Sequence, residues 1–299
     1  MRHFTLPLAL LLALALPGQV AQARPDPDQL MDTRLLQRKD LSYSFSRLLI
    51  DSVDGQRHYQ LWIGRPRVPA PKGGYPVVWM LDGNAVLGAL DADLLQRLAD
   101  GKAPLLVAIG YQTPLRIERT ARTYDYTPPH PRTQKPKDPL TEQPSGGADV
   151  FLDLMRDRLR PAIAAKAPIN PEQQALWGHS YGGLLVLHAL LTRPGEFAHY
   201  AAASPSLWWA NGISAQRVAQ FKQGMTGHDA DLLLMRGTQE PGNPRGPSIG
   251  PPDRLMQQLI HNLNGTPHLT VSYQPFEGMS HGETLPASLR YVLRRLYAP

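Results

Sequence analysis

Three fixed positions near the middle of the chain, Gly178-x-Ser180-x-Gly182, restrict its fold more than any other feature. An apolar, strand-like segment, Gln174–Trp177, precedes them, and an apolar helical segment, Gly182–Leu191, follows. This order of strand, sharp turn and helix is typical of a nucleophile elbow, in which a strained serine presents its hydroxyl at the edge of a sheet. We expect glycine here because neighbouring backbone crowds the turn. The alternative is a glycine-rich turn with an incidental serine.

Short apolar segments alternate with helical ones along the chain, which predicts an α/β fold with a mostly parallel central sheet and helices on both faces. Pro76–Leu81 is continuously apolar, as expected of a strand buried on both sides. Asp54-Gly55 lies between two alternating segments and predicts an N-terminal antiparallel hairpin. The expected strands are Leu41–Leu49, Arg57–Ile63, Pro76–Leu81, Leu105–Ile109, Gln174–Trp177, His199–Ala203, Asp231–Arg236 and Leu269–Gln274. The expected helices are Ala85–Ala99, Phe151–Ala165, Gly182–Leu191 and Pro286–Tyr297.

The N-terminal residues have the pattern of a cleavable secretory signal peptide. Arg2 and His3 are followed by an apolar run over 6–16 and by Ala21-Gln22-Ala23, a typical cleavage site. The run is shorter than the roughly 17–25 residues that cross a bilayer, which disfavours the alternative of an uncleaved anchor. We therefore expect residues 1–23 to be a leader and residues 24–299 to form one domain, exported to the periplasm.

Cysteine is absent from the 299 residues, so disulfides, thiolate metal sites, lipid attachment at a cysteine and a cysteine nucleophile are excluded. The formal net charge of +6 is modest and lies in no Lys/Arg block, which disfavours nucleic acid as a partner. Cations do gather between Arg116 and Lys137. They form either a solvated loop or a positive rim that attracts an anionic small molecule.

A serine at an elbow needs a base and an acid, which in α/β-hydrolases follow it in the order acid, then histidine. His281 lies in the loop after the last expected strand and is the predicted base. Glu240 follows the penultimate strand and is the predicted acid. Asp253, or a Ser–His pair without a carboxylate, remains an alternative for the acid.

The oxyanion of the reaction needs two backbone N–H donors. One expected donor is Tyr181, the residue after the nucleophile. The other comes from Gly83 or Asn84, in the loop after the strand that ends at Leu81. This second assignment depends on position alone, because the loop lacks the glycine-rich pattern of lipases.

Several motifs occur together in a recognisable order. They are Met80-Leu81-Asp82-Gly83-Asn84-Ala85, Arg122-Thr123-Tyr124-Asp125-Tyr126-Thr127-Pro128, Gly146-Gly147-Ala148-Asp149, the elbow with Gly183-Leu184, and Ser204-Pro205-Ser206-Leu207-Trp208-Trp209. With them the chain resembles the esterase-D-type α/β-hydrolases, and more narrowly the periplasmic esterases that open the trilactone of enterobactin-type catecholate siderophores. The resemblance covers nearly all of the chain after the leader. It implies that Ser180 and His281 are the catalytic pair and that Arg122 contacts substrate.

A ferric tricatecholate is anionic and presents flat aromatic rings, which suit arginine and aromatic side chains. The residues that we expect to contact it are Arg119, Arg122, Tyr126, Trp208 and Trp209. For the two tryptophans, core packing is the alternative. The two proline-rich segments, 128–147 and 241–252, are expected to be surface loops of open role.

The predicted function is therefore that of a serine esterase acting on a small-molecule ferric siderophore. It would need no metal or cofactor of its own, since any iron belongs to the substrate. One alternative is a general carboxylesterase or acyltransferase that acts on another ester. The other is a protein that binds the ferric siderophore without hydrolysing it, which the presence of both serine and histidine disfavours. The sequence does not indicate oligomeric state or a receptor contact.

Overall fold

The computed structural model describes residues 27–130, 133–212, 214, 217–218, 221, 227–240 and 252–299. The predicted leader, 1–23, and nearly all of the second proline-rich segment lie outside these residues. Among the described helices, none is both long and apolar enough to cross a membrane.

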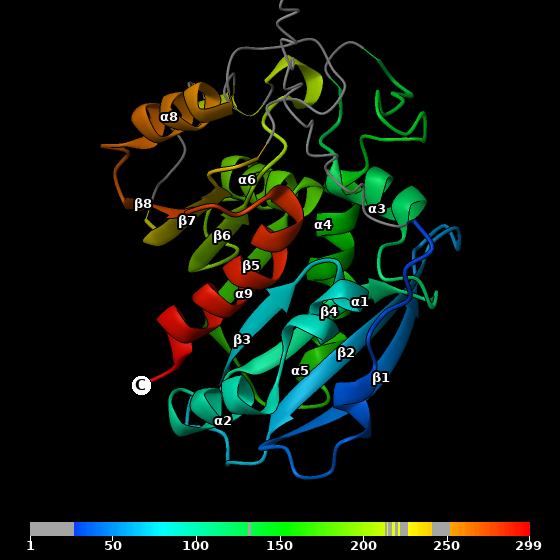
Figure 1. Ribbon diagram of the computed structural model, residues 1–299, viewed down its shortest axis with the longest axis vertical. Coiled ribbons are helices and arrows are strands. Elements are labelled where there is room, and N and C mark those ends of the chain that lie inside the picture. The colour runs from blue at the N-terminus through cyan, green and yellow to red at the C-terminus, as the bar shows by residue number, and fades with distance from the viewer. Residues whose placement is uncertain are drawn as a thin grey trace, which may run out of the picture.

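A single eight-stranded sheet organises the described chain (Figure 1). Its strand order is β1-β2-β4-β3-β5-β6-β7-β8. The first three strands in this order pair antiparallel, and the remaining pairs are parallel. The strands are β1 (Tyr43–Asp51), β2 (His58–Pro66), β3 (Tyr75–Met80), β4 (Leu105–Tyr111), β5 (Ile169–His179), β6 (His199–Ala203), β7 (Ala230–Gly237) and β8 (Leu269–Phe276). The predicted α/β-hydrolase sheet and its N-terminal hairpin are confirmed.

The continuously apolar strands are explained by two hydrophobic cores, one on each face of the sheet. In β3, Val77 and Trp79 belong to one core, whereas Val78 and Met80 belong to the other. Successive side chains of a strand point to opposite faces, so a strand that is covered on both sides has no position left for a polar residue. The carboxyl ends of these buried strands carry the loops of the candidate site.

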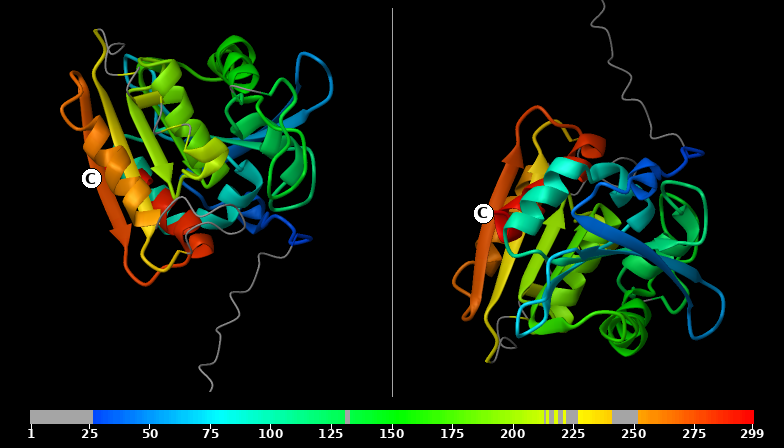
Figure 2. Two further views of the ribbon diagram at one scale, coloured as in Figure 1. Left: turned by 90° about the horizontal axis from the view of Figure 1, so that it is seen from above. Right: turned by 90° about the horizontal axis from the view of Figure 1, so that it is seen from below.

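Helices cover both faces of the sheet, as Figure 2 shows. One core includes side chains of α2 (Ala92–Asp100) and α9 (His281–Tyr297). The other includes side chains from α3 (Arg119–Tyr126), α4 (Ala148–Leu154), α5 (Arg160–Ala164), α6 (Tyr181–Thr192) and α8 (Pro252–Leu263). A π-helical turn, Met155–Leu159, joins α4 to α5. The short α1 (Gly83–Val86) follows β3 directly.

Several helices differ from the sequence expectation. The sequence did not predict α3 and α8, and the helix expected over Phe151–Ala165 begins at Ala148 and contains the π-helical turn. The helix predicted over Ala85–Ala99 is divided, because Asp91 is extended and its carboxylate accepts the Leu94 amide as the N-cap of α2. The last helix begins at His281 and not at Pro286, which lies inside it. Ser280 and Glu283 form a capping box there, and this box fixes the helix start.

Candidate active site

Ser180 occupies the sharp turn between β5 and α6, with φ 61° and ψ −117°. Positive φ is strained for a residue with a β-carbon, and such strain is characteristic of functional turns. A β-carbon on Gly178 would lie 2.4 Å from the Gly182 carbonyl carbon, and one on Gly183 would lie 2.7 Å from the Ala203 oxygen. At Gly182 itself the nearest atom is 3.5 Å away. Crowding therefore explains Gly178 and Gly183, whereas Gly182 has room for a β-carbon.

His281 lies beside the elbow although about a hundred residues separate the two in sequence. It is the first residue of α9, and its ring centroid is 4.4 Å from that of His179, the residue before Ser180. Its Nδ1 is 3.0 Å from Glu240 Oε2. Because this contact engages Nδ1, Nε2 is the nitrogen left to take the serine proton. The His281 side chain is 42% exposed, so substrate can reach it.

Glu240 is held by several donors at the end of β7, and its side chain is only 1% exposed. Its Oε1 accepts the Gly237 amide at 2.8 Å and the Thr284 hydroxyl at 3.0 Å, and it also accepts the Ser204 hydroxyl. Arg236 Nη1 is 3.4 Å from Oε2. Burial raises the pKa of Glu240, but the bond to His281 and its charge, with the Ser204 bond, outweigh burial and bring that pKa to about 2. Glu240 is therefore ionised beside His281, while the side chain of Asp253 lies outside the described residues.

The predicted oxyanion donors lie on two neighbouring turns. Tyr181 is the first residue of α6, and Gly83 and Asn84 are the first residues of α1. First-turn N–H groups have no partner within their own helix. A β-carbon on Gly182 would lie 3.8 Å from Asp82 Oδ2, which shows that the turn before α1 adjoins the elbow. The Asn84 side chain donates to the carbonyls of Tyr111, Thr113 and Leu115, so it fixes its loop, and only its backbone is available for catalysis.

Arg122 is held in place by a neighbouring carboxylate. Its Nε and Nη2 donate to the two oxygens of Asp82, each at 2.7 Å, and its side chain is 12% exposed. The guanidinium carbon also lies 5.5 Å from the ring centroids of Tyr126 and Tyr181. Because Nε and Nη2 bind Asp82, Nη1 is the guanidinium nitrogen left to bind a ligand. Arg119, one turn earlier on α3, is exposed.

The aromatic residues that we expected to contact substrate divide into two groups. Tyr126 is wholly buried and its hydroxyl accepts the Asp82 amide, while Trp209 is 2% exposed. Both rings pack in the core, so neither presents an exposed face to a ligand, and for Trp209 the structure shows the core packing that was the alternative. Trp208 is half-buried, and its ring centroid is 5.9 Å from that of Tyr181. Of the three aromatic candidates, Trp208 remains available to a ligand.

Sequence reasoning missed the residues that position the acid. Ser204 and Thr284 both donate to Glu240, and they come from segments 80 residues apart in the chain. Ser204 belongs to the Ser-Pro-Ser motif, and its φ of 44° marks another strained turn. The Ser280-x-x-Glu283 pattern was a readable signal for the start of α9, and it would have placed His281 and Thr284 in the first turn of that helix. Among the described residues, no group of three or more His, Asp and Glu side chains could hold a metal ion.

The fold, the strained serine and the Glu240–His281 pair define a serine hydrolase of the α/β-hydrolase class. The chain belongs to the putative esterase family, whose sequence pattern matches residues 52–240.

Several characterised proteins are similar to this chain over most of its length. An apo-salmochelin esterase of Escherichia coli O6:H1 is 35% identical over 91% of this chain and 84% of its own length. The ferri-bacillibactin esterase BesA of Bacillus subtilis is 36% identical over 82% of this chain and 87% of its own. The solved structure of the enterobactin hydrolase IroE in complex with DFP superposes with a TM-score of 0.72 at 32% identity. That comparison covers 89% of this chain and 99% of the solved one.

Proposed function

We propose that this esterase hydrolyses the ester bonds of an enterobactin-type catecholate trilactone, and that it does so in the periplasm to help release iron. The observation that carries the proposal is the position of Arg122 and Trp208. Both contact the ring of Tyr181, the residue after the nucleophile. A cation and a partly exposed aromatic ring beside the reacting serine suit an anionic, aromatic acyl group. The siderophore esterases among the relatives support the same substrate class.

In the first half of the reaction, Ser180 Oγ attacks a lactone carbonyl carbon while His281 Nε2 takes the hydroxyl proton. The ionised Glu240 at Nδ1 stabilises the imidazolium that forms. The amides of Tyr181 and of Gly83 or Asn84 donate to the oxyanion. The carbon–oxygen bond to the leaving alcohol then breaks, and His281 returns the proton to that alcohol.

In the second half, a water molecule attacks the acyl-enzyme and gives a proton to His281. The tetrahedral intermediate collapses, Ser180 recovers its proton, and the linear acid leaves. Opening the trilactone removes the scaffold that preorganises the three catechols, so the product holds iron more weakly. We propose no cofactor for the enzyme, and the iron is part of the substrate.

Hydrolysis of ferric and iron-free enterobactin by the purified protein tests the proposal, with the Ser180→Ala variant as control. Linear and monomeric catechol products are followed by chromatography and mass spectrometry. We expect turnover by the wild type and none by the variant. Absence of turnover, with short aryl esters still cleaved, would retain the esterase and reject the siderophore.

The same experiment separates the other two candidate functions. A general carboxylesterase would hydrolyse a panel of short-chain esters faster than enterobactin. A protein that only binds the ferric siderophore would keep its function in Ser180→Ala, whereas an esterase would lose it.

The signal-peptide pattern of residues 1–23 supports the periplasmic part of the proposal. N-terminal sequencing of the protein recovered from a periplasmic extract tests it. We expect a start at Arg24.

A further inference from the structure

Asp138 is a fully buried carboxylate in the first proline-rich segment, outside the catalytic residues. Its Oδ1 accepts the Leu140 amide at 2.9 Å, and the amide and hydroxyl of Thr141 at 2.7 and 2.9 Å. Its Oδ2 accepts the Tyr181 hydroxyl at 2.5 Å. Three of these donors belong to the segment itself, and the fourth comes from the residue after the nucleophile.

The base of this segment is tied to the body of the protein independently of Asp138. Within the segment, the Ser145 amide donates to the Pro136 carbonyl at 3.0 Å. The Gly146 amide donates to the Thr127 hydroxyl and the Gly147 amide to the Tyr124 carbonyl, each at 2.8 Å. The last two bonds keep the segment attached to α3 and its C-cap. The Asp138–Tyr181 bond fastens its tip to the catalytic turn.

A buried carboxylate that loses a donor must recover one from water. Loss of the Tyr181 bond therefore favours an open form of the segment, in which Asp138 Oδ2 is hydrated. Glu142, at φ 56°, lies four residues from Asp138 in a strained backbone conformation that opening would release.

Tyr181 also organises the surface beside the serine. Its ring centroid lies 5.5 Å from the Arg122 guanidinium carbon and 5.9 Å from the Trp208 ring centroid. The hydroxyl that Asp138 accepts thus belongs to the ring on which both substrate candidates pack. A substitution of Asp138 therefore affects Arg122 and Trp208 through Tyr181, without changing Ser180, His281 or Glu240.

We propose that residues 133–147 form a latch segment, closed onto Tyr181 by Asp138, that fixes the Arg122–Trp208 surface for a bulky anionic acyl group. Asp138 is then a specificity-determining positioning residue. This inference rests on the proposed siderophore function for its substrate, but closure of the latch segment does not depend on that substrate. A small neutral ester does not reach the Arg122–Trp208 surface and does not need the latch segment closed.

Kinetics of Asp138→Ala on two substrates test the specificity. We expect the KM for ferric enterobactin to rise about tenfold, because loss of one hydrogen bond to a carboxylate lowers the fraction of closed enzyme by about that factor. The kcat for 4-nitrophenyl acetate should stay within about twofold of wild type. Asp93→Ala, an exposed carboxylate on α2, is the matched control. An equal loss on both substrates would mean general damage to the elbow, and no change on either would mean that the segment has no role. Both results overturn the proposal.

Hydrogen exchange of the peptide spanning 133–147 tests the latch without the siderophore. Asp138→Ala and Tyr181→Phe should each raise its exchange rate about tenfold, and the double variant no further. Tyr291→Phe removes a tyrosine hydroxyl bond on α9 and should leave this peptide unchanged. Unchanged exchange in Tyr181→Phe overturns the latch alone. Failure of the wild type to hydrolyse enterobactin overturns the proposed function alone.

Discussion

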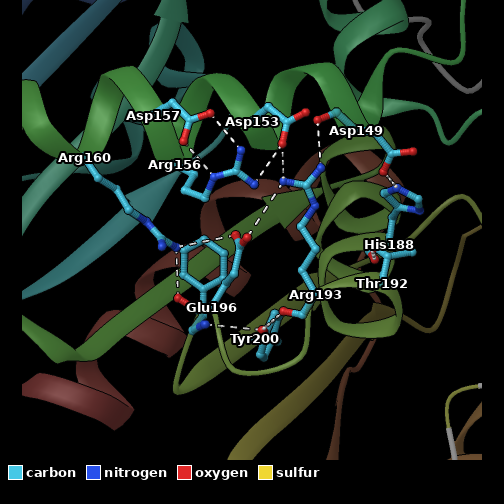
Figure 3. Close-up of polar contacts among 11 residues, drawn as sticks. Asp149, Asp153, Arg156, Asp157, Arg160, His188, Thr192, Arg193, Glu196 and Tyr200 are labelled. Atoms are coloured by element: carbon cyan, nitrogen blue, oxygen red, sulfur yellow. Dashed lines mark hydrogen bonds and ion pairs between the residues drawn. The ribbon is translucent and has the colours of Figure 1, made fainter. Parts of the chain in front are cut away.

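His281 and His188 each contact a carboxylate, but in the first pair the carboxylate is the buried partner and in the second pair the histidine is. His281 Nδ1 is 3.0 Å from the buried Glu240, and the His281 side chain is 42% exposed. His188, on α6, has Nε2 2.6 Å from Asp149 and Nδ1 2.7 Å from Arg217 Nη1, with a side chain 1% exposed. Figure 3 shows the His188–Asp149 contact between α6 and α4, beside a cluster of aspartate and arginine side chains.

The difference shows what a histidine needs in order to act as a base. At His188 both ring nitrogens are occupied, and burial lowers its pKa despite the neighbouring Asp149. Since Arg217 donates to Nδ1, the neutral ring donates from Nε2 to Asp149 and has no lone pair left. At His281 the carboxylate is buried, the ring is 42% exposed, and Nδ1 is the nitrogen that contacts Glu240, so Nε2 is left to accept a proton. The His188–Asp149 pair joins α6 to α4, whereas the His281–Glu240 pair has the arrangement that proton transfer needs.

Replacing each histidine by alanine separates the two roles most strongly. His281→Ala should lower kcat on a short aryl ester about 10⁴- to 10⁶-fold, because the serine loses its base. His188→Ala should leave kcat near wild type and lower the free energy of unfolding by about 2 kcal/mol, because two buried hydrogen bonds are lost. Initial rates and urea denaturation measure both effects. The reverse pattern would contradict the comparison.

Replacing Glu240 should slow hydrolysis, and replacing Asp149 should not, as for the two histidines that they contact. Glu240→Gln should lower kcat about 10²- to 10⁴-fold, because the neutral amide no longer stabilises the imidazolium. Asp149→Asn keeps the shape of a half-exposed partner and should leave kcat unchanged. If Asp149→Asn slowed hydrolysis as much as Glu240→Gln, the assignment of the acid would be wrong.

The free energy of unfolding at low pH should report the ionisation of Glu240. Its pKa is lowered from 4.5 to about 2, so the ionised form stabilises the fold above about pH 5, and this stabilisation is lost as the pH falls toward 2. The shift corresponds to about 3 kcal/mol. Urea denaturation at pH 6 and pH 3 should therefore show a steeper loss for the wild type than for Glu240→Gln. Parallel losses would mean that Glu240 is not ionised against His281.

Removing the hydroxyls that hold Glu240 should have the smallest effect. Ser204→Ala and Thr284→Ala each delete one donor to Oε1, while Gly237 and His281 still hold the carboxylate. We expect kcat to fall several-fold, with the KM for the aryl ester unchanged. A loss as large as that of Glu240→Gln would show that these hydroxyls act directly in the reaction.

The sheet and the strained turn at Ser180 were predictable because their signals are local. Apolar runs such as Pro76–Leu81 reflect burial on two faces, and the elbow requires glycine where a β-carbon would meet backbone, as at Gly178. His199–Ala203 was predicted with the bounds that the structure shows. The start of α9 differs from the prediction because Pro286, which fits the first turn of a helix, lies inside it, whereas the capping box of Ser280 and Glu283 fixes the start at His281.

The rest of the site depends on contacts that no local pattern shows. Tyr126 and Trp209 are candidates for ligand contact in sequence, yet Tyr126 packs against Tyr111 and Phe151, and Trp209 packs against Tyr181. The bond from Tyr181 to Asp138 joins residues 43 positions apart, and the pairing of Arg122 with Asp82 spans 40. Only the folded chain shows that Arg122 lies at the site with two of its guanidinium nitrogens already hydrogen-bonded to Asp82.

Labelling with diisopropyl fluorophosphate tests the central claim most directly, because the Ser180 oxygen must displace fluoride from phosphorus with the help of its base. Mass spectrometry of the digested protein locates the phosphoryl group, and the inactivation rate is compared among wild type, His281→Ala and His188→Ala. We predict a single label at Ser180, formed at the wild-type rate in His188→Ala and at least about 10³-fold more slowly in His281→Ala. A label on another residue, or equal slowing in both histidine variants, would contradict the account.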